Sequence, residues 1–444
     1  MLPTGPDPYV MASLHDYLVD DQVGLLHTLD PETVPSGAPN FFHYSASLSE
    51  TRSLFNRPCV RKVGGAAATG ERARNRALLR AVSVYCASFC EPERLPLGCS
   101  AELDAAHVPP EAFAQFHIDQ VDQPGFPWVA FDSSTPVRWK ETEVVGTSER
   151  ILVPAVFVFT PYYPRPGSGE APIFQPSITG LACDTVLARA TLAALCDVIK
   201  EDALAMTWQS RSTPTQLRVE TLSDANYELV ARFERTGVAV KLLVLETESR
   251  IPVLVATLTG NRPELPGLVC SAAAGLDPEA TIRQVLEELA HAYFHCERIQ
   301  AQSPGATVAE PESVISGADH VLFWWDPAHA SLAQFLFASR ERVEFEELPQ
   351  LSRGSPAADL AWLTERLGEL GRRALVAPLT TADVRDLGLH VVRALIPGYH
   401  PLLLGAAMQP RGGERLRRAF DLQRDWPAPA DLPHPFAACG FYHE

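Results

Sequence analysis

Residues 77–85 read ALLRAVSVY, an apolar run with a polar residue at its fourth position and another at its seventh. The segments ALCDVIKED at 194–202 and VLEELAHAY at 285–293 repeat this pattern. The three polar doublets are Arg80 and Ser83, Asp197 and Lys200, and Glu288 and His291. Residues three apart share one face of a helix. The pattern predicts three mostly buried helices that bring their polar pairs to one interior site, although such pairs also occur on solvated helix faces.

Composition limits the class of protein. The chain has 444 residues, of which 46% are hydrophobic, so it can bury a large core in one large domain or in two or three smaller ones. Its formal charge of −17, with no Lys/Arg-rich run, would repel a phosphate backbone and disfavours nucleic acid as a partner. No apolar stretch approaches the roughly 18–20 residues of a membrane helix, and the N-terminus lacks the features of a signal peptide. We therefore expect a cytoplasmic protein with no membrane association.

The nine cysteines form no CxxC pair and no Cys/His cluster at the spacing of zinc ligands. We expect most of them to be buried thiols and predict no metal site. One alternative stays open, because Cys86 and Cys90 are four residues apart on an expected helix and could bind a metal together with Cys99.

Helical and strand-like segments alternate irregularly along the chain. A helix is expected at about 70–90, and another from about 278 with Asp277 as its N-cap. Strands are expected in ILVPAVFVF, QLRVETL, VAVKLLVLE and IPVLVATLTG, between residues 151 and 260, and LFWWDP (322–327) reads as a buried strand and turn. This order favours an α+β fold over a doubly wound sheet. We expect an N-terminal strand and turn segment, 1–60, packed on a main domain, 61–444.

The order of the longer blocks carries a resemblance to a known family. GG at 64–65 is followed by TGERARNRALLRAVSVY, ITGLACDTVLARATLAALCDVIKEDA, EATIRQVLEELAHAY, DHVLFWWDPAHASLAQFLF, LHVVRALIPGYHPL and, near the C-terminus, PHPF. In this order and spacing the sequence resembles the YcaO family, in particular the cyclodehydratases that install azolines in ribosomally made peptides. The resemblance covers most of the chain.

The resemblance implies a YcaO-type α+β fold with mixed and antiparallel sheets, in which Glu-x-x-Glu pairs on helices hold Mg²⁺ against the phosphates of ATP. A Cys, Ser or Thr side chain attacks the preceding amide, ATP phosphorylates the amide oxygen, and loss of phosphate leaves the azoline. Carboxylates suit this task because Mg²⁺ is a hard cation that prefers oxygen ligands and offsets the phosphate charge.

This chain departs from the family pattern at most of the acidic positions. The resemblance puts the two glutamates of the first helix on Arg80 and Ser83, and those of the second on Asp197 and Lys200. Arg80 and Lys200 would each put a cation where a dication should bind.

At other positions of the family pattern, some residues are retained and others are replaced. The arginine of the second helix falls on Glu201, and the following Asp202 is retained. In the third helix Glu288 is retained, whereas His291 replaces a ligand. A one-residue shift of register, which would make Glu201 or Glu287 a ligand, would turn each helix by about 100° and move its apolar residues off the core.

Two further departures concern the glycine turn and the tail. The lysine of a GGKG turn falls on Ala66. The tail, PxPxP in the family, retains Pro433 and Pro435 but has Ala437 in place of the last proline. We expect this tail to be held less firmly than in the family.

These replacements support a leading hypothesis of a partner-dependent or non-catalytic subunit that needs no cofactor. Its expected partners are a leader-binding maturation protein, the precursor peptide and, in one version, a second and active YcaO protein. The alternative is an active cyclodehydratase that holds ATP and Mg²⁺ through rearranged ligands. A free-standing leader-binding module is disfavoured because no winged-helix segment stands at either end. His390, His400 and His434 lack the nucleophile motif of a catalytic triad.

Overall fold

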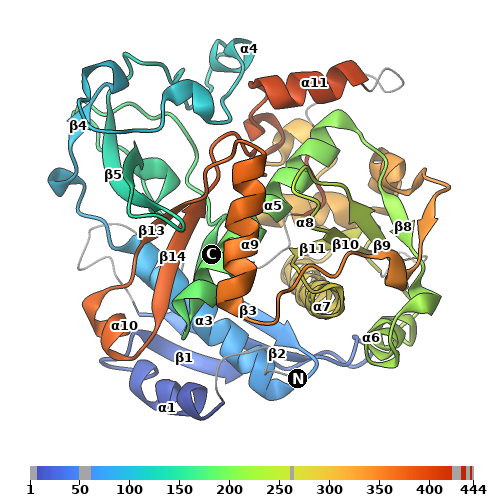
Figure 1. Cartoon of the computed structure of the whole chain (residues 1–444). Coiled ribbons are helices and arrows are strands. Elements are labelled where there is room, and N and C mark those ends of the chain that lie inside the picture. Colours follow the sequence, from blue (N-terminus) through green and yellow to red (C-terminus); the bar gives the residue numbers. More distant parts are fainter. Residues whose placement is uncertain (1–7, 50–61, 261–264, 423–431, 437–440, 443–444) are drawn as a thin grey trace.

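In the described part of the chain, three β-sheets and three long helices form the framework (Figure 1). The computed structural model describes residues 8–49, 62–260, 265–422, 432–436 and 441–442. Sheet 1 has the strand order β1 (Leu26–Pro31), β2 (Phe42–Leu48), β3 (Lys62–Ala67), β15 (Phe441–Tyr442) and is antiparallel. Because β2 pairs with β3, this sheet is shared between the two segments expected on either side of residue 60, and their division into domains stays a prediction.

The other two sheets are larger. Sheet 2 has the order β11 (Val269–Ala274), β10 (Val253–Thr259), β9 (Ala239–Leu245), β8 (Thr215–Leu217), β12 (Arg342–Val343), and only its β12–β8 pair is parallel. Sheet 3 has the order β4 (Leu97–Gly98), β5 (Val137–Val144), β13 (Leu375–Pro378), β14 (His390–Leu395), β7 (Leu181–Asp184), with β6 (Arg150–Pro154) paired to β5. The expected α+β class with mixed and antiparallel sheets is confirmed.

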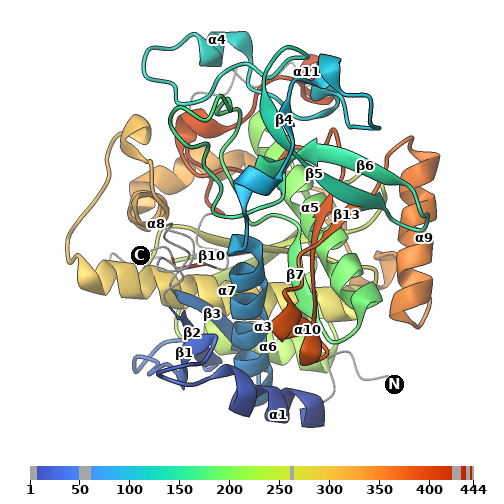
Figure 2. The same cartoon turned by 90° about the vertical axis from the view of Figure 1, so that its left-hand side faces the viewer.

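Each long helix lies between two sheets. Helix α3 (Gly70–Ser88) packs on sheet 1 and on β7 and β14, α5 (Leu187–Ser210) packs on sheet 3 and on β9 to β11, and α7 (Pro278–Gln302) packs on β10, β11 and β3. Figure 2 shows the long axis of α7 running across that of α3. Cover from both sides explains why more than half of the residues of each of these helices are buried, and the expectation of three mostly buried helices is confirmed.

The shorter helices cover the periphery of this framework. They are α1 (Pro8–Leu18), α4 (Ile118–Val121), α6 (Asp224–Glu234), α8 (Gly317–Trp325), α9 (Pro356–Glu369), α10 (Ala382–Asp386) and α11 (Glu414–Leu422). Among the described residues, no helix is both long and apolar enough to span a bilayer.

Two local features follow directly from the sequence. Asp277 caps α7 as expected, since its Oδ1 accepts hydrogen bonds from the backbone N–H groups of Glu279 (3.0 Å) and Ala280 (3.3 Å). Gly65 lets β3 approach α3, because a Cβ at this position would lie 2.8 Å from the backbone N of Ala77. The GG pair therefore permits the close contact between strand and helix.

Several expected elements differ from those observed. LFWWDP is wrong as a strand, because residues up to Trp325 belong to α8. The missed signal is a capping box, in which Ser316 Oγ accepts from Asp319 N (3.2 Å) and Asp319 Oδ2 accepts from Ser316 N (2.8 Å). The strand ILVPAVFVF ends at Pro154, which lacks a ladder donor, and QLRVETL keeps strand pairing only to Leu217.

The positions of Cys86, Cys90 and Cys99 differ from those that the alternative of a cysteine metal site assumed. Helix α3 ends at Ser88, so Cys90 lies beyond it instead of one turn from Cys86. The Cys86 thiol contacts Thr381 Oγ1 (3.5 Å), whereas Cys99 donates to the Ser134 carbonyl (2.9 Å). Within the described ranges, no group of three or more His, Cys, Asp or Glu residues is arranged to hold a metal ion.

Candidate functional site

Arg80 on α3 and Glu288 on α7 form a buried ion pair between the two helices. Arg80 Nη2 donates to Glu288 Oε1 (2.5 Å), and Nη1 donates to the carbonyl of Gly64 in β3 (2.9 Å). Burial would raise the pKa of Glu288, but the charges of Arg80 and Arg76 outweigh it and lower the pKa to about 2. The carboxylate is therefore ionised and already held by cations. The expectation that Arg80 lies within reach of Glu288 is confirmed.

Ser83 and His291, the second members of these doublets, have different surroundings. Ser83 Oγ donates to the carbonyl of Arg80 on its own helix (2.7 Å). His291 is buried, and burial together with the charge of Arg80 holds its pKa well below the usual range. It is a neutral imidazole beside the ion pair.

A second carboxylate of α7, Glu287, was not predicted as part of the site. It is fully buried and accepts hydrogen bonds from Ala68 N (3.1 Å), Arg72 Nη2 (3.1 Å) and Arg76 Nη2 (2.8 Å). Arg76 also lies 3.5 Å from Glu288 Oε1. Arg72, Arg76 and Arg80 recur at every fourth residue of α3, so three arginines in helical register face two carboxylates. That spacing in ERARNRALLR was the available sequence signal.

The α5 doublet forms a separate cluster. Lys200 Nζ donates to Asp197 Oδ1 (2.6 Å) and lies 3.0 Å from Glu201 Oε1. Burial lowers the pKa of Lys200, but the charges of Asp197 and Glu201 outweigh it and raise the pKa far above its usual value. Asp197 Oδ2 also accepts from Gly180 N (2.8 Å) at the start of β7.

These pairings correct one expectation. The three polar pairs were expected to meet at one interior site, but Lys200 pairs within α5, and the second cation beside Glu288 is Arg76. The polar doublets therefore contribute to two ion-pair clusters, one between α3 and α7 and one on α5.

Asp202, one position after Glu201, connects α5 to the C-terminal part of the chain. Its Oδ1 and Oδ2 accept from Arg415 Nη1 (2.6 Å) and Nη2 (2.8 Å), and Oδ1 also accepts from the backbone N of His400 (2.8 Å). Asp202 is 6% exposed, so this bidentate pair is largely desolvated. Its role is to fix α11 and the 398–400 turn on α5.

Magnesium does not fit the residues present. Asp197, Glu201, Glu287 and Glu288 are each in ion pairs with lysine or arginine side chains of the same clusters. A hard dication would have to displace these cations and then bear their repulsion. The carboxylates considered under a shifted register, Glu201 and Glu287, are engaged in the same way.

The described part of the C-terminal tail, 432–436, makes hydrogen bonds to the rest of the chain, and the expectation that the tail is held less firmly than in the family stays a prediction. The carbonyl of His434 lies 3.0 Å from His320 Nδ1, His434 Nε2 lies 2.9 Å from the carbonyl of Leu403, and Trp208 Nε1 donates to the carbonyl of Leu432 (3.3 Å). Pro433 and Pro435 are buried, as are His434 and Phe436. The sequence argument used only Ala437, which lies outside the described residues, and missed the contacts of His434.

Lowering the pH from about 7 to about 5 is expected to destabilise the folded chain through the two buried histidines of this contact. Burial lowers the pKa of His320 to about 4, and burial with the neighbouring His320 holds the pKa of His434 well below its usual value. Both stay neutral in the folded chain but titrate near 6.5 in the unfolded chain, so their stabilisation is complete above about pH 6.5. It falls by about 2 kcal/mol per histidine at pH 5 and continues to fall toward pH 4.

Urea unfolding at the two pH values measures this dependence. His434→Gln keeps a donor and an acceptor but does not titrate, so it should lose the share of one histidine, whereas the exposed His27→Gln should retain the wild-type dependence. An equal pH dependence of His434→Gln and wild type would contradict the assignment.

Comparisons with known proteins match the sequence of this chain to one family. The family model described as "YcaO cyclodehydratase, ATP- and Mg2+-binding" matches residues 64–400. An uncharacterized protein of Methanothermobacter thermautotrophicus is 26% identical over 359 residues, which cover 80% of this chain and 85% of that protein.

Solved structures share the fold at low identity. A heterocyclase in complex with substrate and cofactor superposes with a TM-score of 0.78 at 19% identity and covers 97% of this chain, which spans only 57% of that protein's length. YcaO from Methanopyrus kandleri, bound with AMPPCP and Mg²⁺, has a TM-score of 0.64 at 19% identity, with 89% of this chain and 91% of that chain covered. The E. coli microcin synthetase McbBCD complex gives 0.57 at 10% identity, with 86% and 91% covered.

Proposed function

The chain belongs to the YcaO cyclodehydratase family, and from this premise we propose that it acts in the maturation of a ribosomally made peptide as a partner-dependent subunit. In this proposal the chain contributes surface and positioning to a thiazole- or oxazole-forming complex and performs no ATP chemistry of its own. The observation that carries the proposal is the pairing of Glu287 and Glu288 with arginines of α3.

Energetics support this reading over an active enzyme with rearranged ligands. To bind Mg²⁺, Glu288 would have to release Arg80 and leave a guanidinium without its partner in a largely buried position. Breaking a buried pair in this way typically costs about 3–5 kcal/mol. The same cost would recur at Glu287, so recruiting both carboxylates would consume much of the binding energy of a nucleotide.

The isolated protein is expected to bind Mg·ATP with a dissociation constant weaker than about 1 mM, or about −4 kcal/mol of binding energy. Isothermal titration calorimetry with ATP in the presence of Mg²⁺ measures this, and the same titration in excess chelator is the matched control. Heats should be equally small in both. A low-micromolar dissociation constant that depends on Mg²⁺ would favour the active cyclodehydratase.

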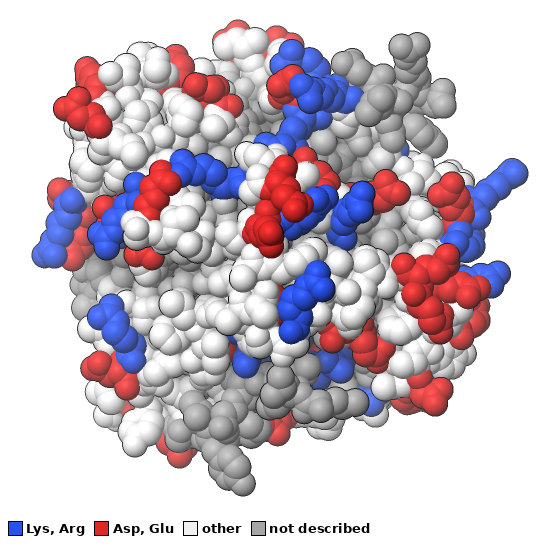
Figure 3. All heavy atoms as spheres, in the orientation of Figure 1, with Lys and Arg blue, Asp and Glu red and all other residues white. Residues whose placement is uncertain are grey.

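The proposal also predicts a stable hetero-oligomer. Its expected components are a leader-binding maturation protein and, if this chain is inactive, a second family member with intact glutamates. The McbBCD assembly of the E. coli microcin synthetase supports such an arrangement. Acidic and basic side chains mix on the face shown in Figure 3, which suits a protein partner better than a polyanion. Tagged protein purified from its native operon should elute with partners, and elution as a monomer only would count against the proposal.

A further inference from the structure

The short helix α4 is anchored to the molecule but carries an exposed apolar side chain. Gln120, which is 8% exposed, donates through Nε2 to the carbonyls of Ala407 (3.2 Å) and Gln409 (2.9 Å). Ile118, at the start of the same helix, is nevertheless 54% exposed, and Val129 in the loop that follows is 42% exposed. An anchored element therefore presents apolar surface to solvent.

Ile118 and Val129 belong to the rim of an apolar cavity of about 240 Å³. The wall of this cavity is formed mainly by Phe116, Phe131, Phe157, Ile173 and Phe174. Asp132 is the one charged residue that lines it, and no lysine or arginine does. The cavity is large enough for one leucine or phenylalanine side chain, whose burial there would be favourable.

The segment 91–135 around this cavity is acidic. It contains eight carboxylates and one arginine, Arg94, but no lysine. Glu91 pairs with Arg94 and Glu93 with Arg165, whereas the other six carboxylates have no lysine or arginine partner in the described part of the chain. These six are all exposed and are Glu102, Asp104, Glu111, Asp119, Asp122 and Asp132. Figure 3 shows a group of acidic side chains, with no basic ones among them, at the upper left of the molecule, where β4 lies in Figure 1.

Three of the six carboxylates adjoin the apolar cavity directly. Asp132 is among the lining residues, and Asp119 and Asp122 each follow a lining residue of α4 in the sequence. Hydrogen bonds from Ser134 and Thr135 go to Oδ1 of Asp132 and hold the pKa of this carboxyl below its usual value. Asp132 is therefore ionised and fixed in its loop.

The acidic surface continues beyond the cavity rim. The backbone N of Ala101 donates to the carbonyl of Ser133 (3.0 Å), which brings the neighbouring Glu102 close to the loop of Asp132. Carboxylates thus stand on more than one side of the apolar opening. We call the apolar cavity, its rim residues Ile118 and Val129, and the six carboxylates without a basic partner the α4 surface.

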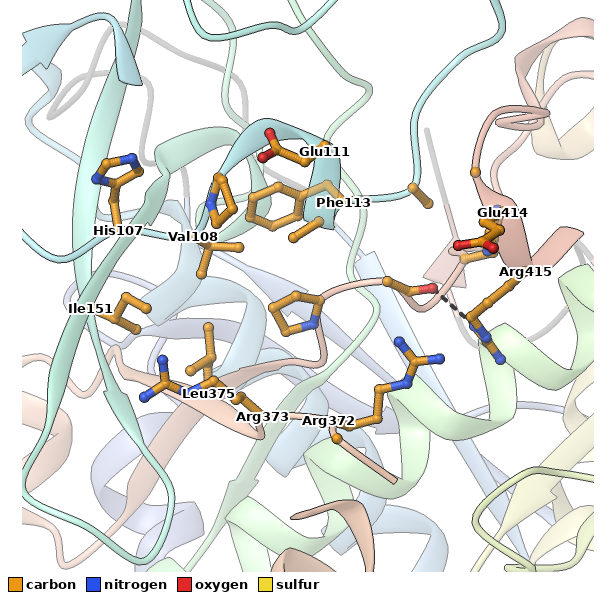
Figure 4. Close-up of a pocket in the computed structure, with 18 of the residues that line it drawn as sticks. His107, Val108, Glu111, Phe113, Ile151, Arg372, Arg373, Leu375, Glu414 and Arg415 are labelled. Carbon is orange, nitrogen blue, oxygen red and sulfur yellow. Dashed lines mark hydrogen bonds between the residues drawn. The ribbon is translucent and has the colours of Figure 1, made fainter. Parts of the chain in front are cut away.

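The larger cavity next to this surface has a volume of about 450 Å³ and a different charge balance. Figure 4 shows Glu111 across it from Arg372 and Arg373. Both arginines are already balanced, because Arg372 pairs with Glu248 and Arg373 with Glu149. They neither attract an anion nor compensate the carboxylates of the α4 surface.

Carboxylates that are held together without counter-ions favour a cationic partner. Their summed potential attracts lysine and arginine side chains and repels acidic ligands. A small organic cation could fill the apolar cavity but would reach only the carboxylate at its rim. A polypeptide segment with an apolar side chain between basic residues would fill the cavity and contact carboxylates on both sides of it. The charge and shape of the α4 surface therefore favour a basic polypeptide.

We propose that the α4 surface binds a basic segment of a partner protein, with an apolar side chain in the cavity and flanking lysines or arginines at the carboxylates. The inference rests on the proposed function for the identity of the protein that carries this segment. Binding of a model peptide requires neither the partner nor ATP, so its failure is distinguishable from the failure to form a hetero-oligomer.

Fluorescence anisotropy with the full-length chain tests the proposal. The probe is a labelled heptapeptide with one Phe between two pairs of Lys and a Gly at each end. One matched peptide replaces Phe with Ser, and the other replaces all four Lys with Gln. At about 50 mM salt, we expect the probe to bind about tenfold more tightly than either matched peptide. Its advantage over the Gln peptide should shrink at about 300 mM salt, because exposed charges are then screened.

Charge variants separate the α4 surface from the general negative charge of the chain. The double variant Asp119→Asn, Asp122→Asn removes two exposed carboxylates that have no lysine or arginine partner, so it should fold. It should bind the Lys probe about fivefold more weakly and the Gln peptide as before. The double variant Glu341→Gln, Glu346→Gln makes the same change in charge at exposed positions beside β12 and should bind as wild type.

A second pair of variants tests the apolar cavity. Ile118→Ser changes a largely exposed rim residue and should remove the preference for Phe over Ser. Ile315→Ser is the matched control, because Ile315 is 77% exposed and lies outside the cavity. Equal weakening by the two charge variants, equal affinity for the Phe and Ser peptides, or wild-type binding by Ile118→Ser would overturn the proposal.

Discussion

Arg80→Glu is expected to destabilise the protein by about 3–5 kcal/mol and to leave Mg·ATP binding undetectable. This change restores the residue type that the family resemblance implies at position 80, yet it removes the cation that holds Glu288 and adds a third carboxylate beside Glu287 and Glu288. Arg76, which lies 2.8 Å from Glu287 and 3.5 Å from Glu288, would then be shared between these two carboxylates, with Arg72 as the other cation beside Glu287.

Urea unfolding and thermal melting with and without Mg·ATP measure both parts of this prediction. Arg235→Glu makes the same substitution at an exposed ion pair and should change the unfolding free energy far less than Arg80→Glu does. Arg80→Met separates loss of the cation from gain of a carboxylate, and its effect should lie between the two. If Arg80→Glu melts like wild type, Arg80 is not the structural counter-ion of Glu288, and a gain of stability from Mg·ATP would show that the cluster binds nucleotide.

Asp202→Ala is expected to cost a similar amount, about 3–5 kcal/mol, for a different reason. The substitution leaves Arg415 without its bidentate acceptor and the backbone N of His400 without a partner. The loss of stability should be largest in α11 and the 398–400 turn, because Asp202 links both of them to α5. Hydrogen exchange should therefore rise there more than in α3 or α7.

Glu414→Gln is the matched control for this experiment. Glu414 lies on α11 beside Arg415, but its own ion pair with Arg418 is solvent-exposed, so its removal should cost less than about 1 kcal/mol. An Asp202→Ala variant whose stability and exchange match those of Glu414→Gln would show that the Arg415 pair does not hold α11.

Elements with a continuous local signal could be predicted from the sequence. The run around IPVLVATLTG gave a strand, and the structure explains its lack of alternation, because Val253 and Val255 of β10 pack in the cluster with α5 while Leu254 and Ala256 pack in the cluster with α7. The N-cap at Asp277 and the apolar helices likewise depend on neighbours within a few residues. Helix α8 was missed although its Ser316 capping box was present, because the aromatic run outweighed it.

The features of the candidate site can be separated in the same way, into those that the sequence predicts and those that only the tertiary structure identifies. The sequence by itself determined the family, the three buried helices and the replacement of carboxylates by Arg80 and Lys200, since each of these is a property of residue type and short spacing. Only the tertiary structure decided that Glu287 belongs to the site and that the tail is held by His320. These contacts join residues more than 100 positions apart. Local periodicity carries no information on which side chains meet at such separations, because the packing of α3 and α7 against the shared strand β3 brings them together.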